Sequence, residues 1–95
     1  MNKEVSTLNK EINQFVQKWD VYSLIELVGL AEKLIELYDM DEKEDFLREY
    51  YGKEDGDNIR IIMTVRLLSK MSEVFGAKMV STNVKFKGLW KRLDG

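Results

Sequence analysis

Apolar residues recur at spacings of three and four along much of this chain, and no proline interrupts them. Such spacing places side chains on one face of an α-helix, and proline is the residue that most strongly breaks a helix interior. The chain therefore favours long helices joined by short breaks. The pattern begins with one stripe in the opening segment, formed by Val5, Leu8, Ile12, Phe15, Trp19 and Tyr22.

Residues 24–38 carry apolar side chains on two adjacent seams. A helix that is apolar over so much of its circumference must be covered from two sides, so we expect it at the centre of the fold. Ser23 and Glu26 have the spacing of a capping box, which predicts the start of this helix. We expect the break from the first helix near residues 19–23. The two seams are Leu24, Val28, Ala31, Ile35 and Tyr38, and Leu27, Leu30, Leu34 and Leu37.

Residues 59–75 form the second strongly apolar segment. Their apolar positions continue at helical spacing to the end of the segment, and Gly76 suits the stop of a helix. The preceding residues 52–58 are rich in Gly, Asp and Asn, which predicts a loop. Either Asp57 or Asn58 is expected to cap the helix that follows, since both side chains accept hydrogen bonds from first-turn amides.

Two short stretches also alternate at period two, which leaves a strand interpretation open. About residues 59–67 and 79–87 would then pair as a small hairpin in an α+β fold. The helical interpretation predicts an all-α fold, a compact bundle of four to five helices in a single domain over residues 1–95. In it, the helices at 24–38 and 58–75 form an antiparallel central pair. We favour the bundle because the second apolar run continues beyond the possible strand at helical spacing.

The chain has 95 residues, no cysteine and no histidine. Its length suits one core, and the two absences remove thiolate chemistry, disulfides, the commonest general base and the commonest metal ligand. No catalytic constellation is evident, so we expect no enzyme and no cofactor. Charges interrupt every apolar segment, and the first residues lack the apolar run of a signal peptide. We therefore expect a cytoplasmic protein with no membrane partner.

Charge is divided by position along the chain. Residues 1–58 carry 7 Lys or Arg against 15 Asp or Glu, whereas residues 59–95 carry 8 against 2. The basic charge concentrates in a short amphipathic segment at residues 78–93, where lysines flank two aromatic rings. Such a segment suits nucleic-acid binding through phosphate pairing and base stacking, or packing of its rings into the core with its lysines near the acidic helices. The nucleic-acid-binding candidates are Lys78, Lys85, Phe86, Lys87, Trp90, Lys91 and Arg92.

Aromatic residues supply the candidates for protein binding. Rings bury a large area at a low ordering cost and often anchor interfaces. Two candidates, Trp19 and Tyr22, end the first apolar stripe, and two more, Tyr50 and Tyr51, follow an acidic stretch. The first stripe also has the residues for a short coiled coil, so a homodimer is an alternative to packing within the bundle.

Acidic residues on the second helix form the weakest candidate site. Glu32, Glu36 and Asp39 lie one turn apart on one side, where carboxylates can share a magnesium or manganese ion, but the same spacing suits a solvated face. The sequence thus favours a small non-catalytic protein–protein interaction module: an adaptor, regulator or inhibitor of bacterial or mobile-element accessory type. Nucleic-acid binding through the basic final third is the second hypothesis, and metal-dependent nucleotide hydrolysis is the third.

Overall fold

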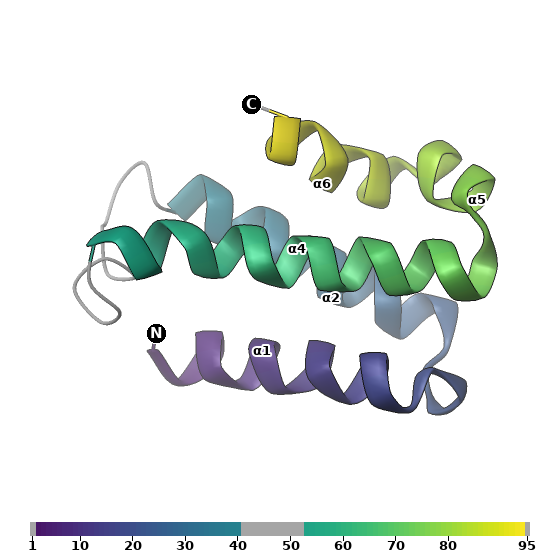
Figure 1. The fold of residues 1–95 in the computed structure, drawn as a ribbon, viewed down its shortest axis with the longest axis horizontal. Helices are drawn as coiled ribbons and strands as arrows, with labels where there is room; N and C mark the ends of the chain where they lie inside the picture. The colour runs from purple at the N-terminus through teal and green to yellow at the C-terminus, as the bar shows by residue number, and fades with distance from the viewer. Residues whose placement is uncertain (1, 41–52, 95) are drawn as a thin grey trace.

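The protein is an all-α bundle (Figure 1). The computed structural model describes residues 2–40 and 53–94, and no strand occurs within those ranges. The predicted all-α fold is confirmed, and the alternative hairpin is wrong, because both of its segments are helical. The helices are α1 (Asn2–Gln17), the short 3₁₀ helix η1 (Trp19–Val21), α2 (Leu24–Met40), α4 (Lys53–Phe75), α5 (Ala77–Thr82) and α6 (Val84–Asp94).

The arrangement places α4 across the front of the bundle in Figure 1, with α1 on one side of it, α6 on the other and α2 behind. The helices α2 and α4 run antiparallel and contact each other, as predicted for the central pair. None of the described helices is both long enough and apolar enough to cross a membrane. One apolar core joins α1, α2, α4, α5 and α6, and its largest fully buried side chains include Ile12, Phe15, Leu27, Leu34, Met63, Leu67, Met71, Phe86 and Leu89.

The connection from α1 to α2 follows the prediction. Residues 19–21 form η1. The capping box is present, because the amide of Glu26 donates to Ser23 Oγ and the amide of Ser23 donates to Glu26 Oε1, each at a donor–acceptor distance of 3.3 Å. The rings of Phe15 and Tyr22 meet edge to face, with centroids 5.7 Å apart. This contact fixes the corner against the core, because edge-to-face rings attract beyond their buried area.

The predicted loop at residues 52–58 is wrong from residue 53 onward, because α4 begins at Lys53. Asp57 and Asn58 therefore lie inside the helix and do not cap it. Glycine costs a helix interior only about 1 kcal/mol relative to alanine, and Asp and Asn cost less. The long packed part of α4 offsets such a cost.

Two residues divide the C-terminal third into three helices. Gly76 separates α4 from α5 with a φ of 95°, a backbone angle that favours glycine. Asn83 separates α5 from α6, and its Oδ1 accepts hydrogen bonds from the amides of Lys85 and Phe86 at 3.0 and 3.3 Å. Asn83 thus caps α6. Residues 79–87, for which the sequence left helix and strand open, belong to α5 and α6 on either side of Asn83.

Candidate functional site

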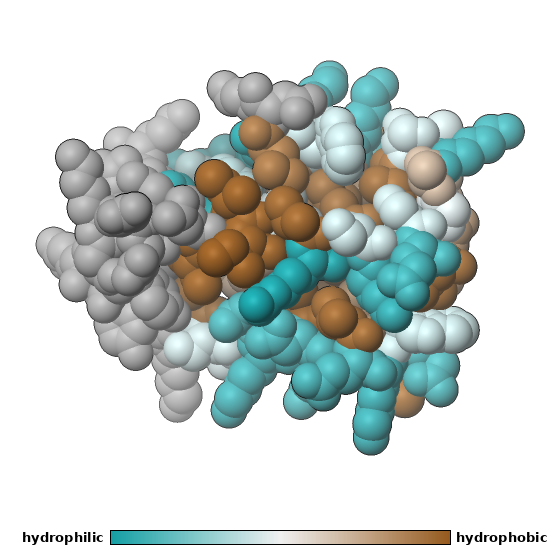
Figure 2. All heavy atoms as spheres, viewed as in Figure 1, coloured by the Kyte–Doolittle hydropathy of each residue, from teal (hydrophilic) through white to brown (hydrophobic). Residues whose placement is uncertain are grey.

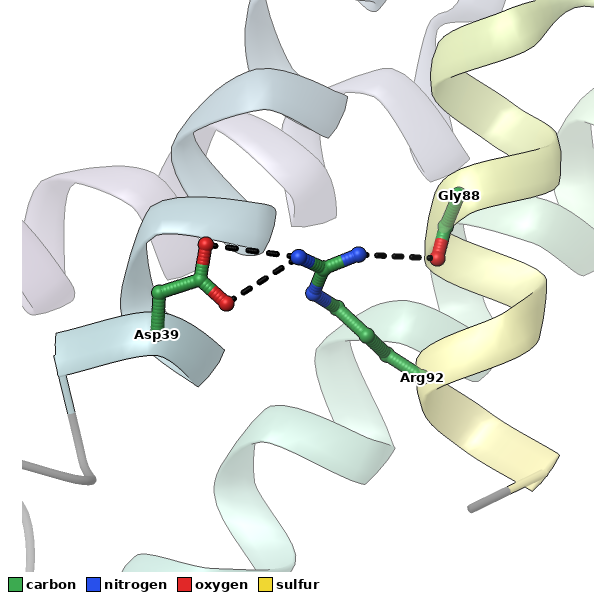
Figure 3. Close-up of polar contacts among 3 residues, drawn as sticks. All are labelled: Asp39, Gly88 and Arg92. Atoms are coloured by element: carbon green, nitrogen blue, oxygen red, sulfur yellow. Dashed lines mark hydrogen bonds and ion pairs between the residues drawn. The ribbon is translucent and has the colours of Figure 1, made fainter.

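One side of α6 faces α2 and is occupied by ion pairs. Lys85 Nζ lies 3.6 Å from Glu32 Oε1. Arg92 Nη2 donates to both carboxylate oxygens of Asp39, at 3.0 and 3.3 Å, while Arg92 Nη1 lies 3.4 Å from the carbonyl oxygen of Gly88 (Figure 3). Two of the predicted nucleic-acid-binding residues are thereby paired with acidic residues of the same chain.

The same ion pairs engage two of the three weak metal candidates. Glu32 and Asp39 each face a cation from α6, and the third candidate, Glu36, is exposed on α2. Within residues 2–40 and 53–94, no group of three or more acidic, His or Cys side chains is placed to hold a metal ion. Two of the three carboxylates therefore act as ion-pair partners of α6.

The inner side of α6 belongs to the core. Phe86 and Leu89 are both fully buried. Phe86 was a candidate for stacking on a base, but its ring is covered by the bundle and a base cannot reach it in this structure. Trp90, the second candidate ring, is 53% exposed.

The third side of α6 borders a pocket of about 460 Å³. Lys87, Trp90 and Lys91 line it, together with residues of α4 and α5. Lys87 and Lys91 make no ion pair with any described residue, and the remaining basic candidate, Lys78, is exposed on α5 outside the lining. The other lining residues are Ser72 of α4 and Ala77, Val80 and Ser81 of α5.

Two helical turns before the pocket-lining Ser72, α4 exposes an apolar stripe. Ile61, Ile62 and Val65 are 45%, 42% and 45% exposed. Ile61, Val65 and Ser72 follow one another at spacings of four and seven, so the stripe and the pocket lie along the same face of α4. Figure 2 shows hydrophobic side chains gathered over the middle of α4 and between α4 and α6. We call Ile61, Ile62, Val65 and the pocket-lining residues the α4–α6 surface.

Sequence reasoning missed the α4 part of this surface. The segment carries two apolar lines at helical spacing, and the sequence does not indicate which residues are covered. One line is Ile61, Val65, Leu68 and Phe75, and the other is Met63, Leu67, Met71 and Val74. The structure buries Met63, Leu67 and Met71, and on the other line it exposes Ile61 and Val65 but buries Leu68. Only the pocket edge formed by Lys87, Trp90 and Lys91 was among the predicted residues.

The predicted aromatic candidates occupy different surroundings. Trp19 is 44% exposed, beside exposed Val21, Leu24 and Ile25 at the corner between η1 and α2. We call these four residues the corner patch. Tyr50 and Tyr51 lie outside the described residues.

The fourth aromatic candidate, Tyr22, is partly buried against α1 and α2. Its hydroxyl lies 3.2 Å from the carbonyl oxygen of Glu11 and 3.3 Å from Gln14 Oε1. Burial raises the pKa of the Tyr22 phenol above its ordinary value, and the negative charges of Glu11 and Glu26 raise that pKa further. The geometry of Tyr22 is thus that of a residue holding the corner together.

Comparison of the chain with protein-family models, curated proteins and solved structures finds no match in any of the three. Any function of this chain must therefore be inferred from the chemistry of the described residues. On the α4–α6 surface, aliphatic side chains, an indole ring and two lysines adjoin a pocket. Such a set can bury apolar groups and pair with anions.

Proposed function

We propose that this chain is a non-catalytic protein-binding module, an adaptor, regulator or inhibitor, whose binding face is the α4–α6 surface. The carrying observation is that three large aliphatic side chains of α4, Ile61, Ile62 and Val65, are 45%, 42% and 45% exposed within about 100° of the circumference of the helix. Single exposed apolar residues are ordinary, but apolar residues gathered on one face mark interaction sites. Exposed Trp90 adds a ring of the kind enriched among interface anchors.

Site-specific photocrosslinking tests this proposal. A benzophenone side chain at position 62 is expected to give a discrete protein adduct in the native cells. Val65→Glu should abolish that adduct, because a carboxylate at this position would have to be desolvated on binding. The matched control is Ile25→Glu, which places the same charge on the corner patch and should leave the adduct intact. Circular dichroism verifies that both variants remain folded.

Two results would reject this binding face. One is the absence of any protein adduct from position 62. The other is an adduct that survives Val65→Glu and disappears with Ile25→Glu, which would move the interface to the corner patch.

Nucleic-acid binding is a second candidate function, favoured by one observation. Trp90 lies exposed between Lys87 and Lys91, and neither lysine has an ion pair among the described side chains. An exposed ring between cations suits a single-stranded nucleic acid. Fluorescence anisotropy with labelled DNA and RNA tests it: binding should weaken steeply with salt, and Lys87→Glu with Lys91→Glu should remove it. Binding that is absent or insensitive to salt would reject this function.

A further inference from the structure

The α4–α6 surface has a chemistry that specifies its partner more closely. We infer that it takes an acidic amphipathic helix of the partner protein, which inserts an apolar side chain into the pocket and places carboxylates beside Lys87 and Lys91. This inference rests on the proposed function as a protein-binding module.

Charge is the first argument. Lys87 and Lys91 lie one helical turn apart at the pocket, and like charges at that spacing repel each other. The neighbouring cations Lys85 and Arg92 are engaged with α2 on the other side of α6. Between Glu73 and Asp94 the chain has no acidic residue. Among the described residues no carboxylate forms an ion pair with Lys87 or Lys91, so the pair of lysines favours an acidic segment and repels a basic one.

The pocket supplies the second argument. Its volume of about 460 Å³ is within the range of roughly 300–1,000 Å³ that is usual for ligand sites. Buried Val80 contributes to its lining, and Trp90 stands at its edge. These residues offer apolar contact to a large side chain, with the two lysine stems beside it. A helix that carries one apolar anchor among acidic residues satisfies both parts of the site.

The shape of the surface provides the third argument. From Ile61 to Ser72, α4 rises by about 16 Å, at roughly 1.5 Å per residue, so the surface accommodates about three turns of a second helix. A peptide that binds as a strand needs an exposed sheet edge, and the described ranges contain helices and no strand. Exposed aliphatic side chains and a pocket that begins about 10 Å further along the same helix suit an elongated helical ligand better than a compact small molecule.

A displayed library of helical peptides about 16 residues long, selected on the full-length chain, tests the inference with a defined probe. The selected peptides should be rich in Asp and Glu around a large apolar residue. Fluorescence polarisation at about 0.05 M salt should show that Lys87→Glu with Lys91→Glu raises their Kd roughly tenfold or more. At about 0.5 M salt the increase should shrink, because salt screens exposed charges.

A matched control separates the site from the overall charge. Lys10→Glu with Lys18→Glu changes the net charge equally, and both lysines are exposed and without an ion pair among the described residues. This control should change the Kd by less than about threefold, because α1 contributes no residue to the pocket and salt screens exposed charges that do not contact the peptide. In a Trp19→Phe background, Trp90 is the only tryptophan, and its emission should shift to shorter wavelength as the bound peptide covers the ring.

The outcomes separate this inference from the proposed function. Selected peptides that are neutral or basic, yet lose binding on Val65→Glu, would overturn the acidic partner and leave the binding face standing. Acidic peptides that bind the Lys87 and Lys91 variant unchanged would also overturn the inference. Selection of no peptide, together with tight binding of a single-stranded oligonucleotide that needs Lys87 and Lys91, would reject both proposals.

Discussion

The positions of two glycines in the C-terminal third differ in whether they tolerate a side chain. Gly88 lies inside α6, and a Cβ added there would meet Ile35 Cδ1 at 3.6 Å, an ordinary contact. Gly76 has a φ of 95° and a ψ of 146° between α4 and α5, a region that other residues enter at a cost of about 1–3 kcal/mol. The first position therefore tolerates a side chain, and the second does not.

Alanine substitutions should separate the two positions. Gly88→Ala is expected to stabilise the protein by roughly 0.5–1 kcal/mol, because alanine favours the helix interior. Gly76→Ala is expected to destabilise it by about 1–3 kcal/mol. Urea unfolding followed by circular dichroism measures both free energies. A destabilised Gly88→Ala variant would show that α6 packs against Ile35 more tightly than these distances indicate.

Tyr22 predicts an effect of high pH on stability. Its pKa is raised in the folded chain, mainly by burial and then by Glu11 and Glu26, whereas the pKa of an unfolded tyrosine is about 10. The folded state therefore holds the phenolic proton more tightly. The resulting stabilisation is fully present below about pH 10 and is lost as the pH rises through the folded pKa.

Comparison with Tyr22→Phe isolates this effect from the other groups that titrate at high pH. The difference in unfolding free energy between the two proteins should change in favour of Tyr22→Phe as the pH rises above about 10. Urea unfolding at several pH values measures that difference. A difference that stays constant across this range would contradict the raised pKa.

At the scale of the element, neighbouring residues of α6 have separate tasks. Leu89 is fully buried in the core, and Trp90 is 53% exposed at the pocket. Leu89→Ala should destabilise the protein by about 2–5 kcal/mol. Trp90→Ala should cost clearly less in urea unfolding, and should weaken peptide binding instead. Equal losses of stability in the two variants would show that Trp90 also serves the core.

Some elements could be predicted from the sequence because local signals and packing agree there. The capping box of Ser23 and Glu26 is a local signal, and the structure confirms it. The first stripe is buried along α1 from Val5 to Phe15, whereas Trp19 is exposed in η1. The start of α4 could not be predicted, because the Gly, Asp and Asn near residues 53–58 favour turns locally while the long packed helix overrides that preference. The site was only half predictable. The charge and the ring of α6 are visible in the sequence, but which apolar residues of α4 stay uncovered depends on where the other helices pack.

At the scale of the whole molecule, every described α-helix contributes to one core. We therefore expect a single cooperative unfolding transition. The fluorescence of Trp19 reports on η1, and that of Trp90 reports on α6. The Trp90→Phe variant keeps only Trp19, and the Trp19→Phe variant keeps only Trp90. The fluorescence transitions of the two variants should each coincide with their own circular dichroism transition in urea. An early fluorescence change from Trp90 alone would show that α6 detaches before the rest unfolds.

Part of the basic charge in the final third of the chain pairs with acidic residues of the same chain. Lys85 and Arg92 from the basic third pair with Glu32 and Asp39 from the acidic part. Exposed pairs of this kind contribute about 0–1 kcal/mol each, so they select which helices are neighbours more than they stabilise the fold. The positive charge left outside these pairs includes Lys87 and Lys91, beside the pocket.

The basic residues of α6 that pair with α2 are different from those that line the pocket, so substitutions on one side leave the other side unchanged in sequence. Lys85 and Arg92 attach the helix to α2, while Lys87 and Lys91 face the pocket. Mutations can alter the pocket side without loosening the attachment, and a stronger attachment can compensate for a destabilising change elsewhere. An engineer could therefore randomise positions 87, 90 and 91 to obtain new binding preferences while the rest of the helix holds its place.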